Sequence, residues 1–181
     1  MLPPILDLCT PRRSTDAQGG HQWLHPADPG CDGHQTWRDA DFDAMCAEIM
    51  KQTGRGLALN QVASLEAEIE DVEERAADGD LLEDIVGVFS GKVEKGDMCQ
   101  MTSVSAVLQI RLSVHPVIGL RRRHVRYYFT EPRGLDSTLV SLRLASKTPD
   151  EPGLREQTRH AQEAQTRGDR WYADLRKRTE P

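Results

Sequence analysis

The chain has 181 residues, of which 38% are hydrophobic and 29% are charged, and its formal net charge is −6. This length suits one domain, with or without an extension. No apolar run approaches the roughly 18 to 20 residues that cross a bilayer, so we expect no membrane association. The first nine residues, MLPPILDLC, lack the basic flank and the length of a secretory signal. We therefore expect a cytoplasmic protein with reduced cysteines.

Charge is divided unevenly along the chain. Residues 57 to 98 contain 3 basic and 12 acidic side chains, whereas residues 99 to 181 contain 15 basic and 9 acidic ones. Two opposed zones can neutralise each other within a fold, or they can present separate faces to partners. The sequence leaves both interpretations open.

Cysteine and histidine are concentrated near the N-terminus, where no helical or strand period is present. Five of the ten such residues in the chain fall in this window: Cys9, His21, His25, Cys31 and His34. The pairs His21-x3-His25 and Cys31-x2-His34 have spacings that one turn can present to zinc. We therefore propose zinc as a cofactor, with these five residues as candidate ligands.

Two other interpretations of residues 10 to 36 stay open. The pairs match no standard zinc finger or ribbon, so the segment could be a metal-free loop packed by Trp23 and Trp37. It could also be disordered. No phosphate loop, nucleophile elbow or metalloprotease motif occurs in the chain, so we name no catalytic residue.

Three helices are predicted before residue 100. The first covers about 39 to 53, with Asp39 as N-cap and Gly54 just beyond the end. Its apolar face contains Phe42, Met45, Cys46, Ile49 and Met50. The second, about 60 to 76, is acidic and amphipathic, and the third is a short apolar helix from Leu81 to about Phe89.

A period of two begins at Val104 and predicts strands. The first covers 104 to 114, with its even-numbered residues facing inward and Gln109 facing outward. A second covers about 123 to 129, and a third about 137 to 144 with Val140, Leu142 and Leu144 inward. Short connections predict an antiparallel meander.

The last predicted element is a basic helix over about 153 to 178, which we expect to dock only through its final turns, at Trp171, Tyr172 and Leu175. The sequence therefore predicts an α+β protein with a three-stranded antiparallel meander covered by amphipathic helices. Its parts are an irregular Cys/His-rich segment (1–38), an α+β core domain (39–150) and a basic C-terminal helix (151–181).

The outward face of the meander would be basic and would include an aromatic side chain. Its members are Arg111, Arg122, His124, Arg126, Tyr128 and Arg143. Such a face can bind phosphates and stack a base, which makes it a candidate contact surface for nucleic acid or a protein partner. Alternatively, the arginines protect strand edges or pair with the acidic helices. His115 and His160 are predicted to be isolated turn or surface residues.

We expect a non-enzymatic adaptor or assembly subunit that binds a protein partner through its acidic and basic faces. The alternative is a nucleic-acid-binding accessory protein that uses the basic sheet face, and a zinc-dependent enzyme is the third possibility.

Overall fold

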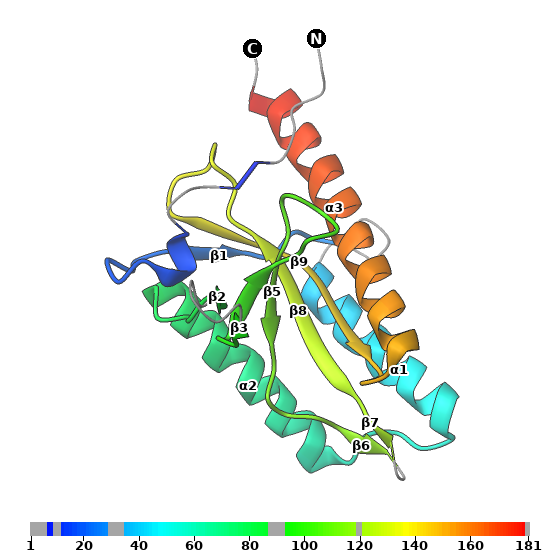
Figure 1. The fold of residues 1–181 in the computed structure, drawn as a ribbon. Helices are drawn as coiled ribbons and strands as arrows, with labels where there is room; N and C mark the ends of the chain where they lie inside the picture. The colour runs from blue at the N-terminus through cyan, green and yellow to red at the C-terminus, as the bar shows by residue number, and fades with distance from the viewer. Residues whose placement is uncertain (1–6, 9–11, 29–34, 87–92, 119–120, 180–181) are drawn as a thin grey trace.

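The computed structural model describes residues 7–8, 12–28, 35–86, 93–118 and 121–179 (Figure 1). The protein is α+β, with a five-stranded mixed sheet in the order β1-β9-β8-β5-β4. The strands of this sheet are β1 (Gln22–Leu24), β4 (Met98–Gln100), β5 (Leu108–Arg111), β8 (His124–Thr130) and β9 (Thr138–Lys147). Two small hairpins pair β2 (Ile85–Val86) with β3 (Val93–Glu94), and β6 (Val117–Ile118) with β7 (Arg121–Arg122). A short 3-10 helix, η1, spans Arg13–Thr15.

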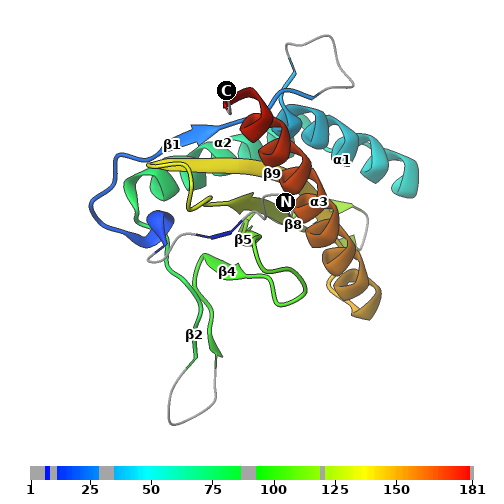
Figure 2. The same ribbon diagram turned by 90° about the horizontal axis from the view of Figure 1, so that it is seen from above.

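Three α-helices cover both faces of the sheet: α1 (Trp37–Thr53), α2 (Leu59–Asp78) and α3 (Glu151–Thr179) (Figure 2). The neighbouring residues Tyr127 and Tyr128 show the two sides, because successive side chains of a strand point to opposite faces. The Tyr127 hydroxyl bonds to Glu73 of α2, whereas the Tyr128 hydroxyl lies 3.5 Å from the Gln157 carbonyl of α3. The core is correspondingly split into two clusters. The first contains the buried apolar residues of α2 and most of those of α1, with Tyr172 of α3, and the second contains Ala161 and Ala164 of α3 with Trp37 of α1.

The first two predicted helices are confirmed, but Asp39 is the third residue of the first one and not its N-cap. Thr36 is the N-cap of α1 and forms a reciprocal capping box with Asp39, while Gly54 ends the helix at φ +69°. Gly79 ends α2 in the same left-handed conformation, at φ +78°. No helix among the described residues is both long and apolar enough to cross a membrane.

The predicted helix over 81 to 89 is wrong in the part that the structure describes. Residues 81 to 86 are extended and contribute β2, and residues 87 to 89 lie outside the described residues. Backbone bonds to Met98 hold this stretch, since Asp84 donates to the Met98 carbonyl and Met98 donates to the Leu82 carbonyl, each at 3.0 Å. A short apolar run does not by itself distinguish helix from strand. Here the backbone bonds to Met98, which is distant in the sequence, favour the extended conformation.

The three predicted strands are present as β5, β8 and β9, but the sheet is larger than a meander. β4 joins one edge, and β1 pairs parallel to β9 at the other. The segment 1–38 is therefore not irregular throughout, because its residues 22 to 24 form an edge strand of the core sheet. The regular strand within 104 to 114 is also shorter than predicted, at four residues.

A register shift in β9 corrects the predicted alternation. Between the pairs Tyr128↔Arg143 and Phe129↔Ser141, β9 contains one extra residue, Leu142. Leu142 therefore packs with α3, as Val140 does, whereas Leu144 packs on the opposite side with α1 and α2. A bulge of this kind reverses the inside and outside faces beyond it.

The prediction that the C-terminal helix docks only through its last turns is also wrong. Small residues along α3 are buried against the sheet, namely Gly153, Ala161, Ala164 and Gly168. Because α3 lies over this face, Gln109 and Tyr128 are buried, with exposed fractions of 1% and 0%. His160, predicted to be a surface residue, is buried as well. The basic outward face is therefore not an open sheet surface.

Candidate functional site

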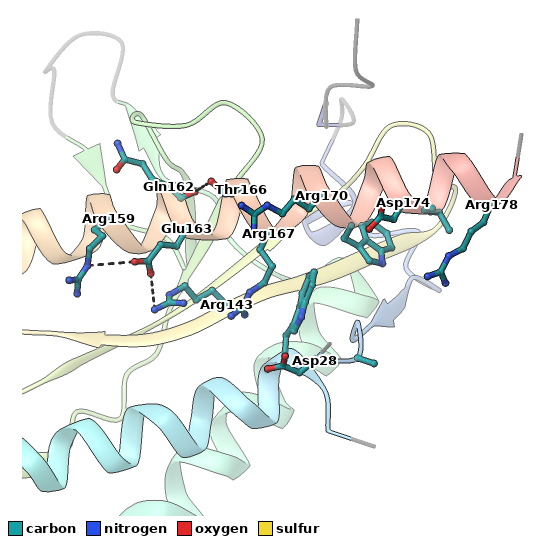
Figure 3. A pocket seen from close by; sticks show the side chains of 14 residues that line it. Asp28, Arg143, Arg159, Gln162, Glu163, Thr166, Arg167, Arg170, Asp174 and Arg178 are labelled. Atoms are coloured by element: carbon teal, nitrogen blue, oxygen red, sulfur yellow. Dashed lines mark hydrogen bonds and ion pairs between the residues drawn. The ribbon is translucent and has the colours of Figure 1, made fainter. Parts of the chain in front are cut away.

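A groove of about 780 Å³ runs along α3, opposite the residues that precede and begin α1 (Figure 3). Arg143 of β9 and Trp37 at the start of α1 contribute to its other wall. Five of the lining residues are arginines: Arg143, Arg159, Arg167, Arg170 and Arg178. We call this feature the α3 groove.

The sequence of α3 explains why arginines gather there. Its small buried residues recur three or four positions apart and bring the helix close to the sheet. The longer side chains beside them must extend along the rim, where an arginine stem packs while its guanidinium reaches water. Arg167, Trp171, Leu175 and Arg178 follow at the same spacing and line the groove from one side of α3.

Some of the groove arginines are neutralised inside the protein. Arg167 donates to both carboxylate oxygens of Asp41, at 2.7 and 3.2 Å, and its guanidinium carbon lies 5.0 Å from the centre of the Trp37 ring. Arg143 lies 2.8 Å from Glu163, and Arg159 lies 3.8 Å from the same carboxylate. These contacts make the floor and one end of the groove rigid.

Arg170 and Arg178 differ from the others. Within the described part of the chain, no carboxylate lies within 4.0 Å of either guanidinium, and both side chains are exposed. Asp174, which lies between them on α3, pairs instead with Lys177 at 3.2 Å. As far as the described residues go, the C-terminal half of the groove therefore presents two cations without a carboxylate partner beside the half-buried Trp171.

The side chains that line the α3 groove are mostly charged or aromatic. Beside five arginines and two tryptophans, the described lining contains the polar side chains of Gln162, Thr166, Asp28, Glu163 and Asp174. Tryptophan and arginine are the residues that most often dominate the binding energy of protein interfaces. The arrangement suits a ligand that carries negative charge and an apolar anchor.

The predicted metal ligands are described only in part. Cys9, Cys31 and His34 lie outside the described residues, whereas His21 and His25 flank β1. Because β1 is extended, the Cα atoms of the two histidines are about 13 Å apart, at about 3.3 Å per residue. The turn that we expected to present both histidines is therefore absent. Among the described residues, no group of three or more metal-ligating side chains is present.

His25 instead belongs to a cluster beneath α2. Its ring stacks on Trp23 at 5.9 Å, and its Nε2 lies 3.8 Å from the Glu73 carboxylate. Glu73 also accepts hydrogen bonds from Arg38 and Tyr127, at 2.7 and 2.5 Å. Burial lowers the pKa of His25, so the imidazole is neutral at pH 7. Its Nδ1 is buried and has no hydrogen-bond partner among the described residues.

The predicted basic sheet face is divided between different surroundings. Arg111 pairs with Asp84, and Arg143 pairs with Glu163. Tyr128 is fully covered and is not available to stack a base. Arg122, His124 and Arg126 stay together at one end of the sheet, away from the α3 groove.

Sequence reasoning missed the groove residues Arg159, Arg167, Arg170 and Arg178. The signal in the sequence was that arginines and Trp171 recur three and four residues apart. We interpreted this pattern as a helix face exposed to solvent. Comparison with protein-family models, with curated proteins and with solved structures found no match to this chain. The functional argument therefore depends on the geometry of the site.

Proposed function

We propose that this protein is a non-enzymatic adaptor or assembly subunit whose α3 groove binds an acidic segment of a protein partner. The observation that carries the proposal is the pair Arg170 and Arg178, exposed and without a carboxylate partner among the described residues, beside Trp171. A glutamate-rich segment with one apolar side chain would supply both the missing charge and an anchor for the indole rings.

Opposite charge on the α1 and α2 side supports an interaction role. A second groove, of about 360 Å³, lies between these two helices and includes Asp39, Asp43, Glu66 and Glu70. The acidic and basic zones of the sequence pair in part, as Arg111 does with Asp84. Exposed members of both zones remain on different helices, namely Glu66 and Glu70 on α2 and Arg170 and Arg178 on α3. Such separation favours selective encounter with charged partners.

Binding of labelled peptides tests the proposal. We expect an acidic peptide that contains one leucine among glutamates to bind, and its lysine counterpart not to bind, by fluorescence anisotropy. The double variant Arg170→Gln, Arg178→Gln should bind the acidic peptide at least about tenfold more weakly than the parent protein, because two charge-assisted contacts are lost.

The matched control is Arg133→Gln with Arg155→Gln, which removes two exposed arginines outside the groove. Affinity should stay within about twofold of the parent protein in this control. Equal losses in both double variants would show that net charge alone attracts the peptide and would refute the groove as the binding site.

The alternative is nucleic-acid binding at Arg122, His124 and Arg126, with Arg122 the exposed member of the three. This binding would weaken steeply with salt, because each phosphate contact releases counterions. Replacing Arg122 and Arg126 should then lower the slope of log affinity against log salt by about two. Absence of binding to DNA and RNA at low salt would remove this alternative.

Zinc binding, and with it a zinc-dependent enzyme, stays a separate proposal. Its support is the density of cysteine and histidine between residues 9 and 34 and the unpartnered ring nitrogen of His25. His21 is also without a hydrogen-bond partner on either ring nitrogen among the described residues. Since the extended β1 separates the two histidines, His25 is the one closer along the chain to Cys31 and His34.

A further inference from the structure

A second group of basic side chains lies where β8 begins and β9 ends, far along β9 from its pairing with β1. His124 of β8 is paired in register with Lys147 of β9, so the two side chains share one face. Arg126, two residues along β8, points to the same face, and its Nη2 lies 3.5 Å from Nδ1 of His124. The His115 ring stacks on the His124 ring with centroids 4.4 Å apart.

Two of these cations are almost completely buried. Arg126 has an exposed fraction of 9% and Lys147 one of 6%. Among the described residues, no carboxylate lies within 4.0 Å of either side chain, and Nε of Arg126 has no acceptor. The only hydrogen bonds that Arg126 makes within this part of the chain are to the Val125 carbonyl and to His124.

The carboxylates of Glu156 and Asp150 act on Lys147 from beyond 4.0 Å, and both are bonded to other groups. Glu156 lies 3.8 Å from Arg123 and accepts from the Thr148 amide at 3.2 Å. Asp150 accepts from the Thr148 hydroxyl and from the Gly153 amide. Glu68, on the other side, accepts from the backbone of Ser113 and Val114.

A buried cation without a counter-ion is strongly unfavourable, and two of them on adjacent strands also repel each other. Burial is the main cause that lowers the pKa values of Arg126 and Lys147. The charge of Arg126 lowers the pKa of Lys147 further, and the carboxylates of Glu156 and Asp150 offset this only in part. Burial also lowers the pKa of His115, and that of His124 to about 4, so both imidazoles are neutral at pH 7 and can donate an N–H to an anion.

We propose that Arg126, Lys147 and the His115–His124 pair form a binding site for a phosphate group, either inorganic phosphate or a terminal phosphate monoester. A dianion matches the two buried cations, and the arginine fork can bond two oxygens at once. The exposed Arg122 of β7 adds a further positive charge that acts on both His115 and His124. The site is independent of the α3 groove and of its proposed partner.

Thermal unfolding in phosphate, compared with sodium chloride of equal ionic strength, tests the site. We expect the Tm of the parent protein to rise with phosphate. At a phosphate concentration ten times the Kd, the folding equilibrium constant increases about elevenfold. Lys147→Met should abolish this rise. In the absence of phosphate, Lys147→Met should be at least as stable as the parent, because a buried unpaired charge has been removed.

Arg155→Met, which removes an exposed arginine on α3, is the matched control and should keep the full response to phosphate. If Lys147→Met does not fold, Arg122→Gln, which removes the further exposed charge, should weaken phosphate binding several-fold in calorimetry. A parent Tm that is equal in phosphate and chloride would overturn the proposal. So would a Lys147→Met variant that folds, is less stable than the parent in chloride and responds fully to phosphate.

A short oligothymidylate with and without a 5′-phosphate separates a terminal phosphate from a nucleic-acid backbone. The proposal expects phosphate-competitive binding of the 5′-phosphorylated form alone. Equal binding of both forms would overturn it in favour of a phosphodiester backbone site. Arg170→Gln with Arg178→Gln should leave the phosphate response unchanged, so failure of this proposal is distinguishable from failure of the groove.

Discussion

Asp41 of α1 and Arg167 of α3 together close the open edge of β9. Arg167 donates to the Leu142 carbonyl at 2.8 Å, and Asp41 accepts from the Leu144 amide at 3.0 Å. The two side chains also bond to each other at 2.7 Å. β1 pairs only with residues 138 to 140 of β9, so this ion pair satisfies edge groups that a neighbouring strand would otherwise bond.

Removal of Asp41 should therefore destabilise the protein. Asp41→Ala leaves the Leu144 amide without its acceptor and the Arg167 guanidinium without its carboxylate, and we expect the free energy of unfolding to fall by about 2 to 3 kcal/mol. Urea denaturation measures this loss. Asp43→Ala, an exposed position on the same helix, should change stability by no more than about 0.5 kcal/mol. Similar values for the two variants would contradict the role of Asp41 at the edge.

The burial of both faces of β5 changes the expected effect of charge at Gln109. Ile110→Asp places an unpaired charge among the residues under α1 and α2 and should unfold the protein, at a cost above about 4 kcal/mol. From the sequence alone, Gln109→Asp would be harmless. In the structure Gln109 accepts a 2.7 Å bond from Gln157 of α3, so we expect a loss of about 1 to 3 kcal/mol.

Ser105→Asp is the exposed control for these two variants, and its stability should match the parent within about 0.5 kcal/mol. Circular dichroism with chemical denaturation gives all three values. A Gln109→Asp protein as stable as the Ser105→Asp protein would show that α3 does not cover this face.

His160 should make the protein less stable as the pH falls. Burial, and then the positive charge of three nearby arginines, lowers the pKa of His160 to about 4. The corresponding pKa in the unfolded chain is about 6.5, so between these values the unfolded state binds a proton that the folded state does not. The contribution of His160 to the free energy of unfolding is therefore fully present above about pH 6.5. Between there and pH 4 the free energy of unfolding falls by about 3 kcal/mol because of this residue.

His160→Gln isolates this contribution, because the other titrating groups are the same in both proteins. The variant should lose less stability than the parent between pH 6.5 and 4, measured as the free energy of unfolding in urea. Parallel pH profiles would mean that the imidazole is protonated equally in the folded and unfolded states.

Elemental analysis tests the zinc proposal. We expect about one equivalent of zinc in the purified protein, lost in Cys31→Ser, because a thiolate ligand binds zinc far better than a hydroxyl. Cys46→Ser on α1 is the control and should keep the metal. Zinc-free protein whose melting curve is unchanged by a chelator would end the proposal.

Local signals in the sequence were enough to locate α1, α2, α3 and the three central strands. Gly54 just beyond the first helix, together with the helical and strand periods, acts over a few residues and needs no knowledge of distant contacts. The start of α1 was less well predicted, because Thr36 and not Asp39 is its N-cap. Only the tertiary structure decided that β1 joins the sheet, that residues 81 to 86 are extended and that β9 contains a bulge. Each of these depends on backbone bonds between segments far apart along the chain, such as Gln22 to the Ser137 carbonyl.

The candidate sites likewise divide into features that the sequence determined and features that only the tertiary structure decided. The basic character of α3 and the cluster of Arg122, His124 and Arg126 were visible in the sequence, because charge is a property of each residue. Which arginines stay unpaired was not visible, since that depends on where Asp41, Asp84 and Glu163 lie after folding. By covering the face that contains Tyr128, α3 turned a predicted binding surface into core, and the groove lies where α3 faces Arg143 and the start of α1.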